Sequence, residues 1–140
     1  MKLSLALRIV LVLVGVAIIL LGLNVGLGGI LTLGWQGPTD FVSVIDPAAF
    51  AVQDNHVRFL GGVWLGVGLV FIGASVFTEI LWKPALVLCA LVFLGGLMRL
   101  GAGDLSLLSG ADIGPSLAAE LVVFPFLAFW IARQARGNLR

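Results

Sequence analysis

Four apolar segments, each about as long as a bilayer is thick, occupy most of the 140-residue chain. They cover residues 7–30, 57–77, 84–100 and 115–132. A spanning helix needs about 20 mainly apolar residues, and in lipid such a run satisfies its own backbone hydrogen bonds only as a helix. The runs do not alternate with period two, which argues against barrel strands. We therefore expect an all-α integral membrane four-helix bundle, formed as a single transmembrane domain over residues 1–140.

The composition also places the chain in the membrane class. Hydrophobic residues make up 61% of it and charged residues only 11%, whereas soluble domains are about 45–50% apolar and about 25% charged. The formal net charge of +1 is too small to favour nucleic acid as a partner. We expect the lipid bilayer as the main partner, with other membrane subunits or self-association as further candidates.

The chain lacks the motifs of the common catalytic and metal-binding classes. It contains no P-loop, GxSxG, HExxH or CxxC motif, and it has one histidine and one cysteine. Cys89 falls in the middle of an apolar segment, where we expect a small buried hydrophobe. We predict no cofactor, no metal and no catalytic residue, and we favour a protein that is not an enzyme.

Charges in the connections predict the orientation. Four spans leave both termini on one side, which receives six basic residues: Lys2, Arg8, Lys83, Arg133, Arg136 and Arg140. The other side carries the acids Asp40, Asp46, Asp54, Asp104 and Asp112. By the positive-inside rule both termini are cytoplasmic. Trp35 is expected at the outer interface, and Trp82 and Trp130 at the inner one.

The first segment must be distinguished from a cleaved signal peptide, because basic residues precede it. Its apolar run is longer than the about 7–15 residues of a signal-peptide core, and no A-x-A-like site follows. We expect a retained helix.

A long outer connection, residues 33–55, separates the first two spans. It contains the turn signals Gly37-Pro38 and Asp46-Pro47. Its apolar stretches predict that it folds back over the outer helix ends, with a short interfacial helix after Pro47. Asp54 or Asn55 is the expected N-cap of the second span.

Glycines form small-xxx-small repeats on the first two helices. Gly22 and Gly26 lie on the first, and Gly62 and Gly66 on the second. Such pairs let helix backbones approach closely in lipid. They indicate either dimerisation or packing of helices within one chain, and we favour intrachain packing.

Polar side chains recur at one depth in the four helices. Asn24, Arg58, Arg99 and Glu120 all fall in the outer third of the expected spans. A charge inside hydrocarbon is costly, about 2.5–3.5 kcal/mol at the centre on translocon scales, so Glu120 needs an arginine partner. The cluster is either an interhelical clamp or the lining of a cavity for a headgroup, a quinone or a relayed proton.

Two further residues border this predicted cluster. His56 lies at the outer end of the second span, where it is either a boundary residue or a proton carrier. Pro125 lies within the fourth span, removes one backbone hydrogen bond and should bend the helix near Glu120.

These residues together resemble a known family. The elements are Arg58-Phe59-Leu60-Gly61-Gly62, Gly66-Val67-Gly68, Arg99, Gly114-Pro115, Glu120 and Pro125. They are similar to the bacterial membrane family called domain of unknown function 4345. The resemblance implies a four-helix inner-membrane protein in which Arg58, Arg99 and Glu120 belong to the shared pattern, and it implies no activity. The layout is more loosely similar to DoxX-like membrane proteins, some of which are associated with quinone-linked enzymes.

Three functions remain open. The favoured one is an accessory or scaffold component of a larger membrane assembly. The alternative is a protein that binds an amphiphile, a lipid or a quinone, at a polar site in the outer leaflet. A small multidrug-type proton-coupled transporter is disfavoured, because those proteins carry their acid in the first helix whereas Glu120 lies in the fourth.

Overall fold

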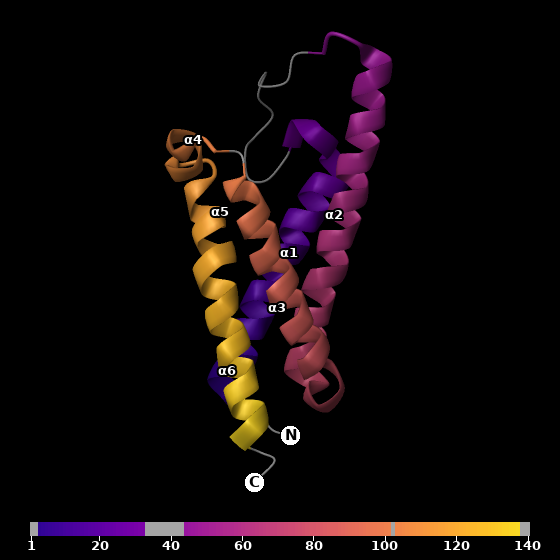
Figure 1. Ribbon diagram of the computed structural model, residues 1–140. Helices are drawn as coiled ribbons and strands as arrows, with labels where there is room; N and C mark the ends of the chain where they lie inside the picture. The colour runs from indigo at the N-terminus through magenta and orange to yellow at the C-terminus, as the bar shows by residue number, and fades with distance from the viewer. Residues whose placement is uncertain (1–2, 33–43, 102, 138–140) are drawn as a thin grey trace. The chain divides into compact units, whose positions relative to one another are not determined.

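The computed structural model describes residues 3–32, 44–101 and 103–137, and this part of the chain is helical without strands (Figure 1). Four helices are long and apolar enough to span a membrane, which confirms the predicted class. They cover Leu5–Thr32, Pro47–Val76, Thr78–Leu100 and Gly114–Gly137. The elements are α1 (Leu5–Gly28), η1 (Gly29–Thr32), α2 (Pro47–Val76), α3 (Thr78–Leu100), α4 (Leu105–Ser109), α5 (Gly114–Ala118), η2 (Ala119–Val123) and α6 (Phe124–Gly137).

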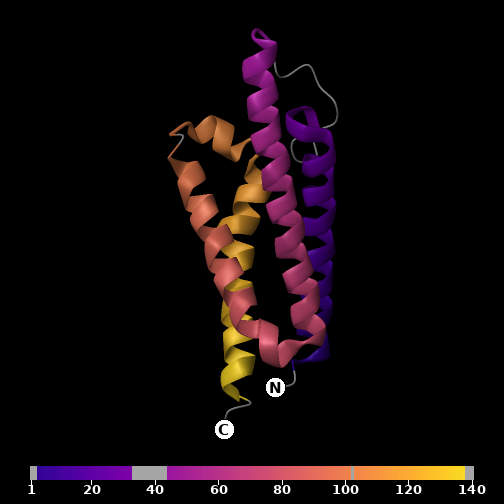
Figure 2. The ribbon, with the colours of Figure 1, turned by 90° about the vertical axis from the view of Figure 1, so that its right-hand side faces the viewer.

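The chain divides into two compact units. The first contains Met1–Ile9 and Gly73–Arg140, and the second contains Val10–Ile72. In the first unit, α3 lies beside the helix formed by α5, η2 and α6 (Figures 1 and 2). In the second unit, α1 lies beside α2 in both views, and the beginning of α2 extends past the end of α1.

Helix α2 begins ten residues before the predicted start at residue 57. Asp46 is its N-cap: Asp46 Oδ1 accepts hydrogen bonds from the backbone N–H groups of Ala48 (2.9 Å) and Ala49 (3.2 Å). Pro47 takes the first helical position, where its missing N–H costs nothing. The predicted N-caps, Asp54 and Asn55, are therefore wrong, and no separate interfacial helix follows Pro47. With 30 residues, α2 is about 45 Å long, which exceeds the about 30 Å hydrocarbon core.

Helix α3 also begins earlier than expected. It starts at Thr78, and Pro84 lies inside it instead of opening it. Lys83, expected in the inner connection, is a helical residue whose Nζ lies 5.5 Å from the ring centroid of Trp82. Some predictions concern residues that the structure does not describe. They are the positions of Lys2, Trp35, Asp40 and Arg140 and the fold of residues 33–43.

Glycine brings α1 and α2 together in the second unit. A Cβ added at Gly22 would lie 2.5 Å from the backbone N of Leu65 and 2.8 Å from the carbonyl oxygen of Gly61. A Cβ at Gly68 would lie 2.7 Å from the carbonyl oxygen of Gly15. The two backbones therefore touch at both levels, and antiparallel packing of this closeness requires residues without side chains.

The contact uses a different glycine register on α2 from the predicted one. A Cβ at Gly62 or Gly66 would meet no atom of the described chain within 4 Å. Their neighbour Gly61, by contrast, faces the backbone of Gly26 directly. Gly22 and Gly26 thus lie against α2 of the same chain, whereas Gly62 and Gly66 have no described atom near their Cβ positions.

Polar contacts join the two ends of the chain in the first unit. The Ser4 backbone N–H donates to Gln134 Oε1 at 2.7 Å, and Gln134 Nε2 donates to Ser4 Oγ at 2.7 Å. Arg8 Nε donates to the Ser75 carbonyl oxygen at 2.7 Å, in the last turn of α2. The beginning of α1 and the end of α6 therefore lie at the same end of this unit.

Candidate functional site

An ion pair links α3 to the segment that follows α5. Arg99 Nη1 donates to Glu120 Oε1 at 2.7 Å and to Ser116 Oγ at 2.9 Å. Ser116 Oγ in turn donates to the carbonyl oxygen of Ile113 at 2.8 Å. We call Arg99, Ser116 and Glu120 the Arg99–Glu120 site. The three side chains come from the last turn of α3, from α5 and from η2.

Glu120 lies in a π-helical turn. The segment η2 spans Ala119–Val123, and the Phe124 N–H donates to the carbonyl of Ala119, five residues earlier. Pro125 follows immediately and has no N–H, so it cannot donate to the carbonyl four residues before it. The π-helical turn accommodates the hydrogen bond that Pro125 cannot make. The sequence predicted a bend at this position. Such turns are rare and frequently found at functional sites.

Gly96 allows the two helices of the site to approach. A Cβ at Gly96 would lie 2.9 Å from Glu120 Cβ, 2.9 Å from Leu121 Cδ2 and 3.3 Å from Glu120 Oε2. A Cβ at the adjacent Gly95 would meet no described atom within 4 Å. Gly96 therefore shapes the space around the carboxylate, and Gly95 does not.

The Glu120 carboxylate is only half satisfied. Its side chain is 16% exposed, and Oε1 is bound by Arg99. Oε2 is buried and has no hydrogen-bond partner among the described residues. A buried acceptor without a donor costs about 1–3 kcal/mol. A donor from outside the described residues, such as a water or a ligand, would remove this cost.

Arg58 belongs to a different cluster, in the second unit. Its Nε donates to Asp54 Oδ2 at 2.6 Å, and its Nη1 donates to the carbonyl oxygens of Gly26 (3.4 Å) and Leu27. Asp54 Oδ1 accepts from the Ile30 N–H at 2.8 Å. Arg58 and Asp54 therefore cap the C-terminal end of α1, whose last carbonyls have no intrahelical donors.

Gly29 makes room for this cap. Its φ of +70° lies in the left-handed region, which closes a helix most readily at glycine. A Cβ at Gly29 would collide with the Asp54 carboxylate. Asn24 takes part nearby through its backbone carbonyl, which accepts from Thr32 Oγ1 at 3.0 Å.

The predicted four-residue layer thus forms two clusters in the two units. Arg99 and Glu120 are paired, whereas Arg58 and Asn24 act at the end of α1. His56 is an exposed residue of α2. Among the described residues, no group of three or more His, Cys, Asp or Glu side chains could hold a metal ion.

Sequence reasoning missed two members of these clusters. Asp54 lies four residues before Arg58, and Ser116 lies four residues before Glu120. Residues at this spacing are neighbours on a helix. This spacing indicates both residues, although Asp54 is expected from the sequence only as a cap and no role is predicted for Ser116.

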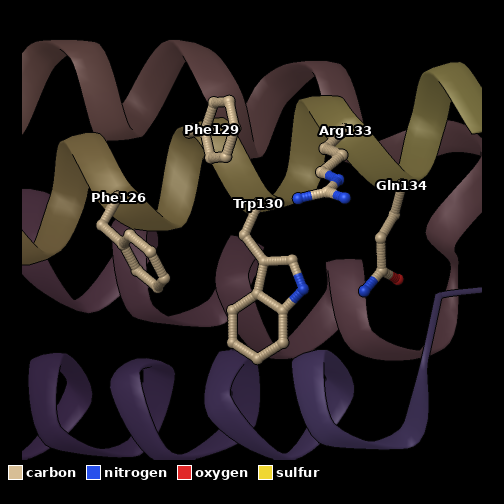
Figure 3. A pocket seen from close by; sticks show the side chains of 5 residues that line it. All are labelled: Phe126, Phe129, Trp130, Arg133 and Gln134. Atoms are coloured by element: carbon tan, nitrogen blue, oxygen red, sulfur yellow. The ribbon is translucent and has the colours of Figure 1, made fainter.

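A shallow hollow of about 410 Å³ lies along α6 (Figure 3). Its lining residues are Phe126, Phe129, Trp130, Arg133 and Gln134. The rings of Phe126 and Trp130 lie 6.1 Å apart between centroids. Aromatic side chains beside an arginine are typical of the membrane–water interface. The position of Trp130 at the inner interface stays a prediction.

Comparison with known proteins identifies the family. A family profile described as Domain of unknown function (DUF4345) matches residues 6–132, so the chain belongs to this family, as the resemblance indicated. No curated protein and no solved structure matches the chain.

Proposed function

We propose that this member of the DUF4345 family binds an amphiphile, a lipid or a quinone-type molecule, at the Arg99–Glu120 site. Its four apolar helices suggest a small multi-pass membrane protein. The observation that carries the proposal is the buried Glu120 Oε2, which has no hydrogen-bond partner among the described residues, beside an arginine whose side chain is 40% exposed. A polar headgroup at this place would supply the missing donor while its apolar tail stays in lipid.

The ion pair between Arg58 and Asp54 supports this interpretation by contrast. Both oxygens of Asp54 are used, one by the Ile30 N–H and one by Arg58. That is what a purely structural pair should show, because buried polar groups are normally satisfied. Glu120 has the same kind of arginine partner, but its buried Oε2 accepts no hydrogen bond from the described residues.

The test is ligand retention by the purified full chain in mild detergent. Replacing Glu120 with Gln and Arg99 with Leu together should abolish retention of a co-purifying amphiphile, measured by native mass spectrometry and organic extraction. A matched variant, Asp54→Asn, changes the structural pair and should keep the ligand. A folded double mutant that retains as much ligand as the wild type would refute the proposal.

A second candidate is an accessory or scaffold component of a larger membrane assembly. It is favoured by Gly62 and Gly66, which leave open space on α2 where another helix could approach closely. Gentle extraction followed by native mass determination tests this. A complex that is lost on replacing Gly62 and Gly66 with Leu supports it, and a lone monomer counts against it.

We also propose a bacterial inner membrane location with both termini in the cytoplasm. In the first unit, Ser4 meets Gln134, and Arg8 meets the carbonyl of Ser75, so both chain ends share one end of that unit. The basic residues Arg133 and Arg136 lie in the same part of α6. A cytoplasmic fluorescent reporter fused to the C-terminus should be active, and a periplasmic phosphatase reporter there should not.

A further inference from the structure

The geometry points to a zwitterionic phospholipid headgroup, with a primary ammonium beside a phosphate, as the ligand of the Arg99–Glu120 site. This inference rests on the proposed amphiphile binding and names its chemical class. The ammonium would donate to Glu120 Oε2, and the phosphate would accept from Arg99.

The first step concerns what Glu120 can accept. A carboxylate oxygen only accepts hydrogen bonds, and Oε2 is the atom without a partner among the described residues. The ligand must therefore present an N–H or O–H group. A quinone carbonyl has no such group, whereas an ammonium or a hydroxyl does.

The second step concerns what Arg99 can still donate. Both of its described hydrogen bonds come from Nη1, to Ser116 and Glu120. Its side chain is 40% exposed. In the described part of the chain, Nε and Nη2 thus make no hydrogen bond and form a fork with the planar geometry that suits a phosphate.

The third step is charge balance. Arg99 and Glu120 together are neutral. A phosphate alone would leave one uncompensated negative charge at a site of low dielectric, which is costly. An ammonium carried by the same ligand cancels that charge and satisfies Oε2 at once. A headgroup with a phosphate and a hydroxyl satisfies the hydrogen bond but not the charge.

The fourth step concerns the source of the headgroup. Large apolar side chains next to the site in sequence are exposed, with Met98 at 74%, Val122 at 65% and Val123 at 48%. On helices of this hydropathy, such side chains contact acyl chains. A membrane lipid therefore fits better than a free phosphate ester.

The experiment measures binding of short-chain phospholipids to the full chain in detergent by native mass spectrometry. The probes are dioctanoyl phosphatidylethanolamine, phosphatidylglycerol and phosphatidylcholine, with soluble phosphoethanolamine and a short-chain quinol as further arms. We expect the ethanolamine lipid to bind at least about tenfold more tightly than the other two phospholipids, the difference of one charge-assisted hydrogen bond.

The decisive variant is Glu120→Gln. Its amide oxygen can keep the bond to Arg99, so the NH₂ group takes the place of Oε2 and a donor replaces the acceptor. Preference for the ethanolamine lipid should be lost. Glu79→Gln, at the other end of α3, is the matched control and should bind as the wild type does.

Each other outcome is decisive. Equal binding of the glycerol or choline lipid, or retained preference in a folded Glu120→Gln variant, overturns the inference. Equal binding of soluble phosphoethanolamine overturns the assignment to a lipid. Binding of the quinol alone leaves the proposed function standing and removes this inference. Binding of no probe removes both.

Discussion

Asp54 and Arg58 lie one turn apart on α2, and their side chains meet at 2.6 Å between Oδ2 and Nε. Together they bind the end of α1, through the Ile30 N–H on one side and the carbonyls of Gly26 and Leu27 on the other. An acid and a base on α2 thereby satisfy backbone groups at the C-terminal end of α1. Arg8 likewise donates to a carbonyl near the end of a helix, that of Ser75 in α2, without a paired acid among the described residues.

Loss of the acid in this cap should destabilise the protein without affecting the ligand site. In Asp54→Ala, the Ile30 N–H and the Arg58 Nε lose their acceptor. We expect a thermal midpoint lower by about 2–5 °C in detergent. Asp46→Asn, which keeps a side-chain oxygen at its own N-cap, is the control and should change the midpoint less. A midpoint unchanged by Asp54→Ala would contradict the capping role.

Adjacent glycines on α2 should differ sharply in their tolerance of a methyl group. Gly61→Ala pushes a Cβ into the backbone of Gly26, and overpacking of this kind costs about 1–3 kcal/mol. Gly62→Ala meets open space and should be neutral or stabilising, since alanine favours a helix over glycine by about 0.5–1 kcal/mol. Thermal unfolding of the two variants side by side measures the difference. Equal stability would show that the α1–α2 contact uses another register.

The adjacent glycines Gly95 and Gly96 of α3 should differ in their effect on ligand binding, although both replacements by alanine change helix propensity equally. Gly96→Ala places a methyl group 2.9 Å from Glu120 Cβ and should displace the carboxylate. We expect amphiphile retention to fall about tenfold or more, the loss of one charge-assisted hydrogen bond. Gly95→Ala has no described neighbour within 4 Å and should retain the ligand fully. If both variants bind alike, Gly96 does not shape the site.

Removal of the proline after the π-helical turn should change the position of Glu120. Pro125→Ala restores an N–H that can donate to the carbonyl four residues earlier, so the turn can relax toward regular α-helix. Residues on the N-terminal side of the turn would then rotate by about 100°, one residue of an α-helix. The contact between Arg99 and Glu120 should weaken, and ligand retention should fall while helix content stays the same. Circular dichroism measures the helix content, and native mass spectrometry measures the ligand retention.

The four helices could be predicted because an apolar run of bilayer length satisfies its backbone hydrogen bonds in lipid only as a helix. Their starts could not be predicted in the same way. The polar residues 53–56 interrupt the apolar count, yet the Asp46 side chain and Pro47 begin α2 before them. Likewise, Pro84 lies inside α3 where it was expected to open the helix. Caps and prolines act on single hydrogen bonds, and an average over twenty residues does not detect them.

The partners of the charged side chains could not be predicted from the sequence either. Depth along each helix places Arg58, Arg99 and Glu120 in one layer, but depth carries no information about which helix faces which. The structure pairs Glu120 with Arg99 across α3 and η2, and it assigns Arg58 to Asp54. A π-helical turn and a glycine without a side chain bring Glu120 and Arg99 into contact.

Sequence alone determined the membrane class, the all-helical architecture, the four long apolar helices and the family, because composition and run length are summed along one chain. Tertiary structure decided which glycine, Gly61 or Gly62, meets α1, and which arginine meets Glu120. Those choices depend on rotations of one residue, about 100°, and on contacts between segments far apart in sequence. Only the packed helices specify them. The packing also buries Glu120 Oε2 without a hydrogen-bond partner among the described residues.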